Sequence, residues 1–518
     1  MSDDGYINLR IVHNVLHGHG PVFNVGERAE AATSPAWIAV LSLARIPLWF
    51  MDPAWVAVLV GIALASLGIA LAILGARRWW SSLGRQASIP LGVLVLIALP
   101  AMWDFASSGF ETGLCFAWLG GCWWVTVRRL DGEPPALHRP LWASVLIGLG
   151  PLVRPDFAIF TLVFAISYTV ASQRTRRGAV LGLAAGLALP VGYQIFRMGY
   201  FGMLVPNTAL AKEAGRALWG RGRLYVDAYL DITLLLVPLV VIAAVVLIFA
   251  WRSRPSLRHT IVALAPVLGG LLHALYVMRV GGDFIFARLL LPATFTVLLP
   301  GAAVPMPPRR FLQGALLAAA GAWVIFSSAQ PPYEPRTQVE AFYFGDLRAA
   351  FVERTGNPDP VTLDDFAVVG GSFWSREAVP GQMVAVLSGR AVPADRPIIV
   401  SGVVGMVSVR LWGTHVADDF ALAEPIGSHM AAGPPGRAGH EKRMEWFWLE
   451  ARFGTGEDPA ADVAAARRAL ACGKLAELVE AVDDPMTPGR FVNNLFGAVD
   501  RTSLRIPVNP FEAERRFC

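Results

Sequence analysis

The stretch that decides the fold is residues 53–76, PAWVAVLVGIALASLGIALAILGA, which contains no charged side chain. As a helix, it is longer than the ~20 residues that cross the hydrocarbon core of a bilayer. The whole chain shares this character, because 55% of its 518 residues are hydrophobic and 16% are charged. Soluble domains carry roughly 25% charged residues. The sequence therefore predicts a polytopic α-helical membrane protein.

Nine further apolar stretches are candidates for spanning helices, two of them short. They are residues 88–103, 109–127, 141–153, 155–171, 178–196, 232–251, 260–279, 287–304 and 311–328. Residues 36–50 are too short to span, and Trp37 and Trp49 favour an interfacial helix held at the headgroup level. We thus expect a transmembrane domain over residues 36–330, with this interfacial helix and about ten spans.

Arginines between the apolar stretches predict the orientation, because cytoplasmic loops carry an excess of positive charge. They recur in every second connection, in groups that begin at Arg77, Arg128, Arg174, Arg252 and Arg309. The other connections, including residues 1–35, then face outward. Topology accounts for the net charge of +5, so we expect no nucleic-acid partner. The predicted location is the plasma (inner) membrane, with multiple passes through the lipid bilayer.

Residues 331–518 are predicted to form an extracytoplasmic domain. Its β-type run at residues 397–404 and its helix-like stretch at 458–481 favour a compact α/β or α+β fold. Cys472 and Cys518 both lie in this region. On the outer face they could form a disulfide, and two free buried thiols are the alternative.

Residues 1–35 form the first predicted outer loop and begin with the adjacent carboxylates Asp3 and Asp4. A carboxylate can act as general base toward a sugar hydroxyl or bind a divalent cation. Glu111, at the outer mouth of the 109–127 stretch, is a candidate second acid. The simpler alternatives are a solvated charge pair and an acid stabilised by a helix dipole.

The other outer connections combine cations with groups that bind hydroxyls. A guanidinium at Arg154, between two short helices, suits a phosphate, and pairing with Asp156 is the alternative. We predict donor-phosphate binding by Arg154, Lys212, Arg279 and Arg288, and substrate binding by Asn207, Asp283, Asp156, Asn24 and Arg28. No cofactor is certain from the sequence, and a divalent cation remains open. For His13 and His17, which are four residues apart without a third ligand, packing is favoured over metal binding.

The order of these motifs resembles the terminal β-(1→2) arabinofuranosyltransferases of mycobacteria and relatives, members of the GT-C superfamily. The resemblance rests on Asp3-Asp4-Gly5-Tyr6-Ile7, Gly18-His19-Gly20-Pro21-Val22-Phe23-Asn24 with Gly26-Glu27-Arg28, Ser108-Gly109-Phe110-Glu111-Thr112, Arg154-Pro155-Asp156, Pro206-Asn207-Thr208, Gly281-Gly282-Asp283-Phe284, Gly439-His440-Glu441-Lys442 and Met486-Thr487-Pro488-Gly489-Arg490-Phe491. Each motif alone is weak, and their order is the specific signal.

The resemblance implies a membrane glycosyltransferase with a catalytic aspartate in the first outer loop, which falls on Asp3 or Asp4. It implies that Glu111 is the second acid. The implied donor is decaprenyl-phosphoryl-arabinofuranose, a polyprenyl-phosphate sugar. The implied acceptor is a cell-wall polysaccharide, the arabinan end of arabinogalactan or lipoarabinomannan. The C-terminal domain would then be a glycan-binding module.

Three points remain open at the level of sequence. Family members carry a transmembrane helix before the double aspartate, whereas Met1 stands two residues before Asp3, so we expect such a helix upstream. The scaffold also fits a GT-C transferase for another lipid-linked sugar. A third interpretation is a non-catalytic membrane assembly or control factor, similar to proteobacterial relatives linked to flagellar motor control. The acids and outer cations favour an enzyme.

Overall fold

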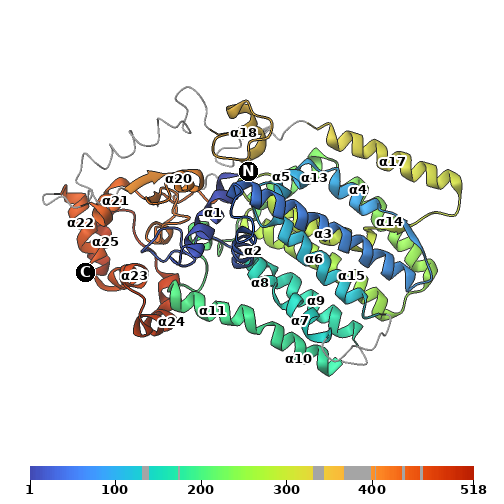
Figure 1. The fold of residues 1–518 in the computed structure, drawn as a ribbon, viewed down its shortest axis with the longest axis horizontal. Helices are drawn as coiled ribbons and strands as arrows, with labels where there is room; N and C mark the ends of the chain where they lie inside the picture. The colour runs from blue at the N-terminus through green and yellow to red at the C-terminus, as the bar shows by residue number, and fades with distance from the viewer. Residues whose placement is uncertain are drawn as a thin grey trace.

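The computed structural model describes residues 1–130, 139–172, 176–330, 344–366, 398–402, 404–433, 438–454 and 459–518. Long helices form a bundle on one side of the molecule, and the shorter helices of the C-terminal region gather on the other (Figure 1). Helix α1 (Asp3–Leu16) lies between the two, which places the double aspartate at their junction.

Five helical segments within the described residues are long and apolar enough to cross a membrane. They are α3 (Pro53–Ser81), the continuous pair α10 (Arg176–Gly186) and α11 (Ala188–Tyr200), α14 (Leu236–Ser253), α15 (Leu257–Val280) and α17 (Arg310–Ser328). This confirms the predicted class, a polytopic α-helical membrane protein.

The other predicted spans are shorter helices. They are α6 (Thr112–Val127), α7 (Arg139–Gly148), α8 (Gly150–Val153), η1 (Pro155–Phe157) with α9 (Ala158–Ala171), and η3 (Arg288–Leu290) with α16 (Leu291–Leu298) and η4 (Leu299–Gly301). The stretch 88–103 differs most, because strand β1 (Ala87–Ile89) and the short helices α4 (Leu91–Ile97) and α5 (Pro100–Ala106) replace one span. Pro90 and Pro100 lack the backbone N–H that a continuous helix would need. Strand β1 pairs antiparallel with β2 (Val304–Pro305).

The predicted interfacial stretch is a helix, α2 (Pro35–Arg45), but its two tryptophans differ. Trp49 is 74% exposed, as an interfacial anchor would be. Trp37 is fully buried, and its indole N–H donates to the Gly109 carbonyl over 3.0 Å. The prediction that Trp37 lies at the headgroup level is therefore wrong, because the loop that precedes α6 supplies its hydrogen-bond partner.

Helices α3 and α6 pack with almost no side chain between their backbones. A Cβ atom on Gly113 would lie 2.1 Å from the Gly61 carbonyl oxygen, and one on Gly120 would lie 2.5 Å from the Gly68 oxygen. Small residues allow this close approach, which is how helices associate where lipid removes the hydrophobic driving force. The packing fixes the start of α6, next to Glu111.

The C-terminal region is mainly helical and contains one small parallel sheet among the residues described. Strands β3 (Ile398–Ser401) and β4 (His415–Asp418) pair from Ile398 with His415 to Ser401 with Asp418, and α20 (Val404–Arg410) connects them. The helices that follow are η5 (Gly427–His429), α21 (Trp446–Phe453), α22 (Ala461–Leu470), α23 (Gly473–Asp483), α24 (Pro488–Ser503) and α25 (Pro510–Phe517). A disulfide joins Cys472 to Cys518, which decides between the two alternatives for these thiols.

Helix α1 is buried on nearly all sides because it packs against both parts of the chain. The Arg10 guanidinium donates to the carbonyls of Phe23 (3.1 Å), Ser408 (3.0 Å) and Thr414 (2.9 Å). The His13 ring stacks on Trp412 with centroids 4.2 Å apart. The remaining helices of the described chain are α12 (Asn207–Ala211), α13 (Trp219–Ile232) and α18 (Leu347–Thr355).

Candidate active site

Asp4 faces a buried arginine of the membrane region. Its carboxylate lies 3.5 Å from Arg288, and the same guanidinium lies 2.6 Å from the Asp283 carboxylate. The positive φ angles of Gly281 (89°) and Gly282 (73°) shape the turn that brings Asp283 to this position. Burial alone would raise the pKa of Asp283, but Arg288 and Lys212 lower it. The cluster therefore holds Asp283 ionised and leaves Asp4 partly exposed.

Asp3 points the other way, into the C-terminal region. Its carboxylate accepts the backbone N–H groups of Met406 (2.7 Å) and Gly405 (3.3 Å), at the start of α20. A Cβ on Gly405 would lie 1.9 Å from the Asp3 carbonyl oxygen, so only glycine permits this approach. Burial raises the pKa of Asp3 to about 7. The two adjacent aspartates thus have different partners, and Asp4 alone contacts the arginine.

Glu111 and Arg154 belong to a second buried ionic chain. Arg154 lies 2.6 Å from the Glu111 carboxylate and 3.0 Å from that of Asp156. Asp156 in turn lies 2.7 Å from Nε2 of His273, a buried residue of α15 that the sequence did not single out. The predicted alternative, pairing of Arg154 with Asp156, is therefore present, and Glu111 is a second partner that the sequence did not suggest.

Lys212 follows α12 and lies at the meeting point of these clusters. Its ammonium group is close enough to Asp283, Arg288, Asp4 and Arg154 for their charges to act on its pKa, which burial lowers. Within the part of the chain that the structure describes, the ammonium forms no hydrogen bond or ion pair. Lys212 is thus a cation near the two paired arginines without a protein anion of its own.

The C-terminal region closes over Lys212. A Cβ on Gly439 would lie 3.0 Å from the Lys212 side chain, so the backbone approaches it closely. The next residue, His440, packs its ring between Phe284 (4.7 Å) and Phe420 (4.5 Å). In the sequence, only the family resemblance drew attention to Gly439 and His440. No spacing rule relates them to Lys212, which lies more than 200 positions earlier.

A largely apolar cavity of about 720 Å³ adjoins the ionic clusters. Trp55, Tyr229 and Phe351 line it, together with Phe110. The Arg288 guanidinium lies 4.6 Å from the Phe110 ring on the side of the ionic cluster. Phe110 therefore contributes both to the apolar cavity and to the surroundings of Arg288.

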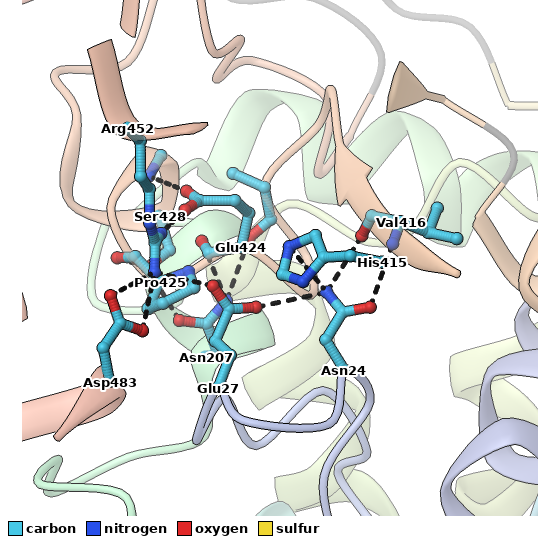
Figure 2. Close-up of polar contacts among 12 residues, drawn as sticks. Asn24, Glu27, Asn207, His415, Val416, Glu424, Pro425, Ser428, Arg452 and Asp483 are labelled. Atoms are coloured by element: carbon cyan, nitrogen blue, oxygen red, sulfur yellow. Dashed lines mark hydrogen bonds and ion pairs between the residues drawn. The ribbon is translucent and has the colours of Figure 1, made fainter. Parts of the chain in front are cut away.

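Three predicted substrate-binding residues instead hold the parts of the molecule together. Asn24 exchanges two hydrogen bonds with the backbone of Val416, each of 3.0 Å. Arg28 donates to the Tyr200 and Ala481 carbonyls. Figure 2 shows Asn24 and Asn207 beside the network around Arg452, and Asn207 donates to the carbonyls of Ala421 and Leu422 over 3.0 Å. Their amide groups have no spare donor in this arrangement.

The last predicted phosphate ligand, Arg279, is separate from the others. Its guanidinium donates to the Gly215 carbonyl over 3.3 Å on an exposed part of the surface. Among the described residues, no three His, Cys, Asp or Glu side chains are grouped closely enough to hold a metal ion. The site as built is thus an ionic cluster of Asp4, Asp283, Arg288, Arg154 and Lys212.

Comparison with known proteins places the chain in a family. A family model described as the AftB family C-terminal domain matches residues 390–514. A curated protein of Mycobacterium tuberculosis named terminal beta-(1->2)-arabinofuranosyltransferase is 33% identical over 583 aligned positions, which cover 98% of this chain and 92% of that protein. The chain belongs to this family. It is therefore a membrane glycosyltransferase of the arabinofuranosyltransferase type, as the motif order predicted.

A second terminal arabinofuranosyltransferase, from Corynebacterium glutamicum, is 30% identical over 588 positions and covers all of this chain and 84% of its own length. No solved structure matches the chain significantly. The alignments with these two relatives cover both the membrane region and the C-terminal region.

Proposed function

We propose that this protein transfers arabinofuranose from a polyprenyl-phosphate donor, decaprenyl-phosphoryl-arabinofuranose, to the non-reducing ends of cell-wall arabinan. The names of its relatives and the order of its motifs support the sugar and the acceptor. The alternation of arginines along the chain supports a site and a C-terminal domain on the outer face of the plasma membrane.

The observation that carries the donor assignment is Lys212. Arg288 and Arg154 are each paired with protein carboxylates, whereas the half-buried Lys212 ammonium has no such partner among the described residues. A partly desolvated cation without a counter-ion is stabilised when a ligand neutralises its charge. A phosphate between Lys212 and Arg288 would do so, and the apolar cavity beyond Phe110 would accept the start of the polyprenyl chain.

Asp4 is the residue that we assign to activation of the acceptor hydroxyl. Its partly exposed carboxylate can take the proton of an arabinan hydroxyl while the new bond forms between that oxygen and the anomeric carbon. The bond from the anomeric carbon to the phosphate breaks, and the lipid phosphate leaves with its negative charge. The fixed cations stabilise that charge, and such preorganised groups are usually the largest electrostatic contribution to catalysis. Glu111 and Asp156 hold Arg154 in place for this role.

The test measures kcat/KM for the donor, lipid-linked arabinose, in the variants Lys212→Met and Lys212→Arg. The full chain in nanodiscs is used. Loss of one charged contact is worth about 1.5–3 kcal/mol, so kcat/KM for the donor should fall roughly 10- to 100-fold in Lys212→Met. Lys212→Arg should recover part of it. Lys474→Met, at an exposed position of α23, is the matched control. Unchanged donor kinetics in Lys212→Met would exclude the assignment.

A further inference from the structure

Helix α24, PGRFVNNLFGAVDRTS, exposes apolar side chains and buries polar ones, which is the reverse of an ordinary surface helix. Its outward side carries Val492 (48% exposed), Phe496 (80%) and Val499 (55%). These positions are four and three residues apart, so they form one stripe along the helix. Its inward side carries Asn494 and Arg501, which are 0% and 8% exposed. A helix at a boundary between protein and water would show the opposite distribution.

The inward polar side chains form hydrogen bonds with the rest of the protein, and these bonds fix which face of α24 is exposed. Asn494 donates to the Ala481 carbonyl over 3.1 Å, and Arg501 donates to the Gly202 carbonyl over 3.0 Å. Gly202 lies just beyond the last residue of α11. Turning the helix to bury its apolar stripe would break both contacts, and buried polar groups are stable only when they are hydrogen-bonded. The apolar stripe therefore stays outward.

The surroundings of α24 identify what covers that stripe. α24 lies at the Tyr200 end of α11 (Figure 1), and Phe491 packs so tightly on Gly199 that a Cβ there would lie 2.2 Å from its ring. α11 forms the second half of the candidate span Arg177–Tyr200. Its own exposed residues are apolar and face the same medium, namely Leu189, Val191 and Ile195. The apolar surface thus continues from the spanning helix onto α24.

We propose that α24 is an interfacial helix, with Val492, Phe496 and Val499 inserted among the lipids of the leaflet that surrounds the Tyr200 end of α11. Exposed Asn493 and Asp500 border the stripe on one side, where headgroups and water would solvate them. The helix anchors the C-terminal region to the bilayer beside the loops that close over Lys212.

The test places a nitroxide label at Phe496→Cys, and in a second variant at Val499→Cys, in the full chain in nanodiscs of phosphatidylcholine and phosphatidylglycerol. The matched control is Glu445→Cys, an exposed position at the start of α21. Relaxation of each label is measured with oxygen, which concentrates in lipid, and with a water-soluble nickel chelate. The native free cysteines, Cys115 and Cys122, are buried.

We expect the ratio of oxygen to nickel accessibility to be several-fold higher at positions 496 and 499 than at 445. Equal ratios at the three positions would mean that the stripe lies in water and would overturn the proposal. Exclusion of both relaxing agents from position 496 would mean a protein partner, a second copy of this chain included, and would overturn it equally.

Discussion

Two ionic clusters of the molecule differ in how their cations are paired. Around Arg452, three carboxylates converge on one guanidinium (Figure 2): Glu27 at 2.7 Å, Asp483 at 3.1 Å, and Glu424. Around Lys212, one ammonium lies beside two arginines that already have acids, and it has no acid of its own in the described chain.

We propose that this difference separates a structural cluster, around Arg452, from a ligand-binding one, around Lys212. The Arg452 cluster joins Glu27 of the N-terminal segment to the turn after β4 and to the ends of α21 and α23, so it fixes elements far apart in the sequence. Its acids exceed its cations, and the protein supplies every contact. In the Lys212 cluster, Arg288 and Arg154 are each paired with two acids, whereas the Lys212 ammonium has no ion-pair partner among the described residues and can take an anionic ligand.

The largest expected effect concerns Asp4. Asp4→Asn should lower kcat by about 10²- to 10⁴-fold, the range for loss of a general base, because the amide cannot accept the acceptor proton. Arg288 keeps its contact with Asp283, so the melting temperature should stay the same. Initial rates with lipid-linked arabinose and thermal unfolding in nanodiscs measure the two quantities. Full activity in both Asp4→Asn and Asp3→Asn would remove the double aspartate from the mechanism.

The next effect concerns Arg452. Arg452→Met leaves Glu27 and Glu424 buried without a counter-charge, and breaking a buried pair in this way costs about 3–5 kcal/mol. We expect a lower melting temperature and faster proteolysis of the C-terminal region. Arg468→Met, which removes an exposed pair with Glu514, should change neither. If Arg452→Met melted like the parent protein but lost donor binding, the cluster would have to be reassigned to function.

The smallest effect is the pH dependence that Asp3 introduces. Its pKa is raised from 3.8 to about 7 by burial, so the folded protein binds this proton more tightly than the unfolded chain. Stability from this group is therefore fully present below about pH 4 and is lost as the pH rises to about 7. Asp3→Asn should flatten part of that decline in melting temperature between pH 4 and 7. Asp104 and Asp418, whose pKa values burial also raises to about 7, contribute to the same decline and remain in that variant. An unchanged pH profile in Asp3→Asn would contradict the placement of Asp3 at α20.

Much of the membrane region was predictable from the sequence because apolar length is a local property. The stretch 53–76 is a single helix, and the β-type run 397–404 contains β3. The broken stretch 88–103 was less predictable. Its composition is apolar throughout, but Pro90 precedes α4 and Pro100 begins α5, so the stretch divides into two helices of seven residues each. Composition indicates where lipid lies and does not indicate whether one helix crosses it.

The site was only partly predictable, since its residues were visible as types but their partners were not. The pairs of Arg154 with Glu111 and of Asp283 with Arg288 lie in or beside connections that the arginine pattern predicts to share one side of the membrane. Which aspartate faces Arg288 depends on the position of α20, about 400 residues away, and no local pattern carries that information. For the same reason Asn24 and Asn207 looked like ligands for sugar hydroxyls, although their amides bind the C-terminal backbone.

The close packing of α3 against α6 has a consequence for the motion that catalysis needs. A polysaccharide end has to enter and leave the site, so one wall of it has to move during each cycle. The backbones meet at Gly61 and Gly113 and again at Gly68 and Gly120, so a small slide would drive a larger side chain into a carbonyl. The wall that carries Glu111 is therefore the stationary one. We expect the moving wall to be the loop with Gly439 and His440, which packs on Lys212.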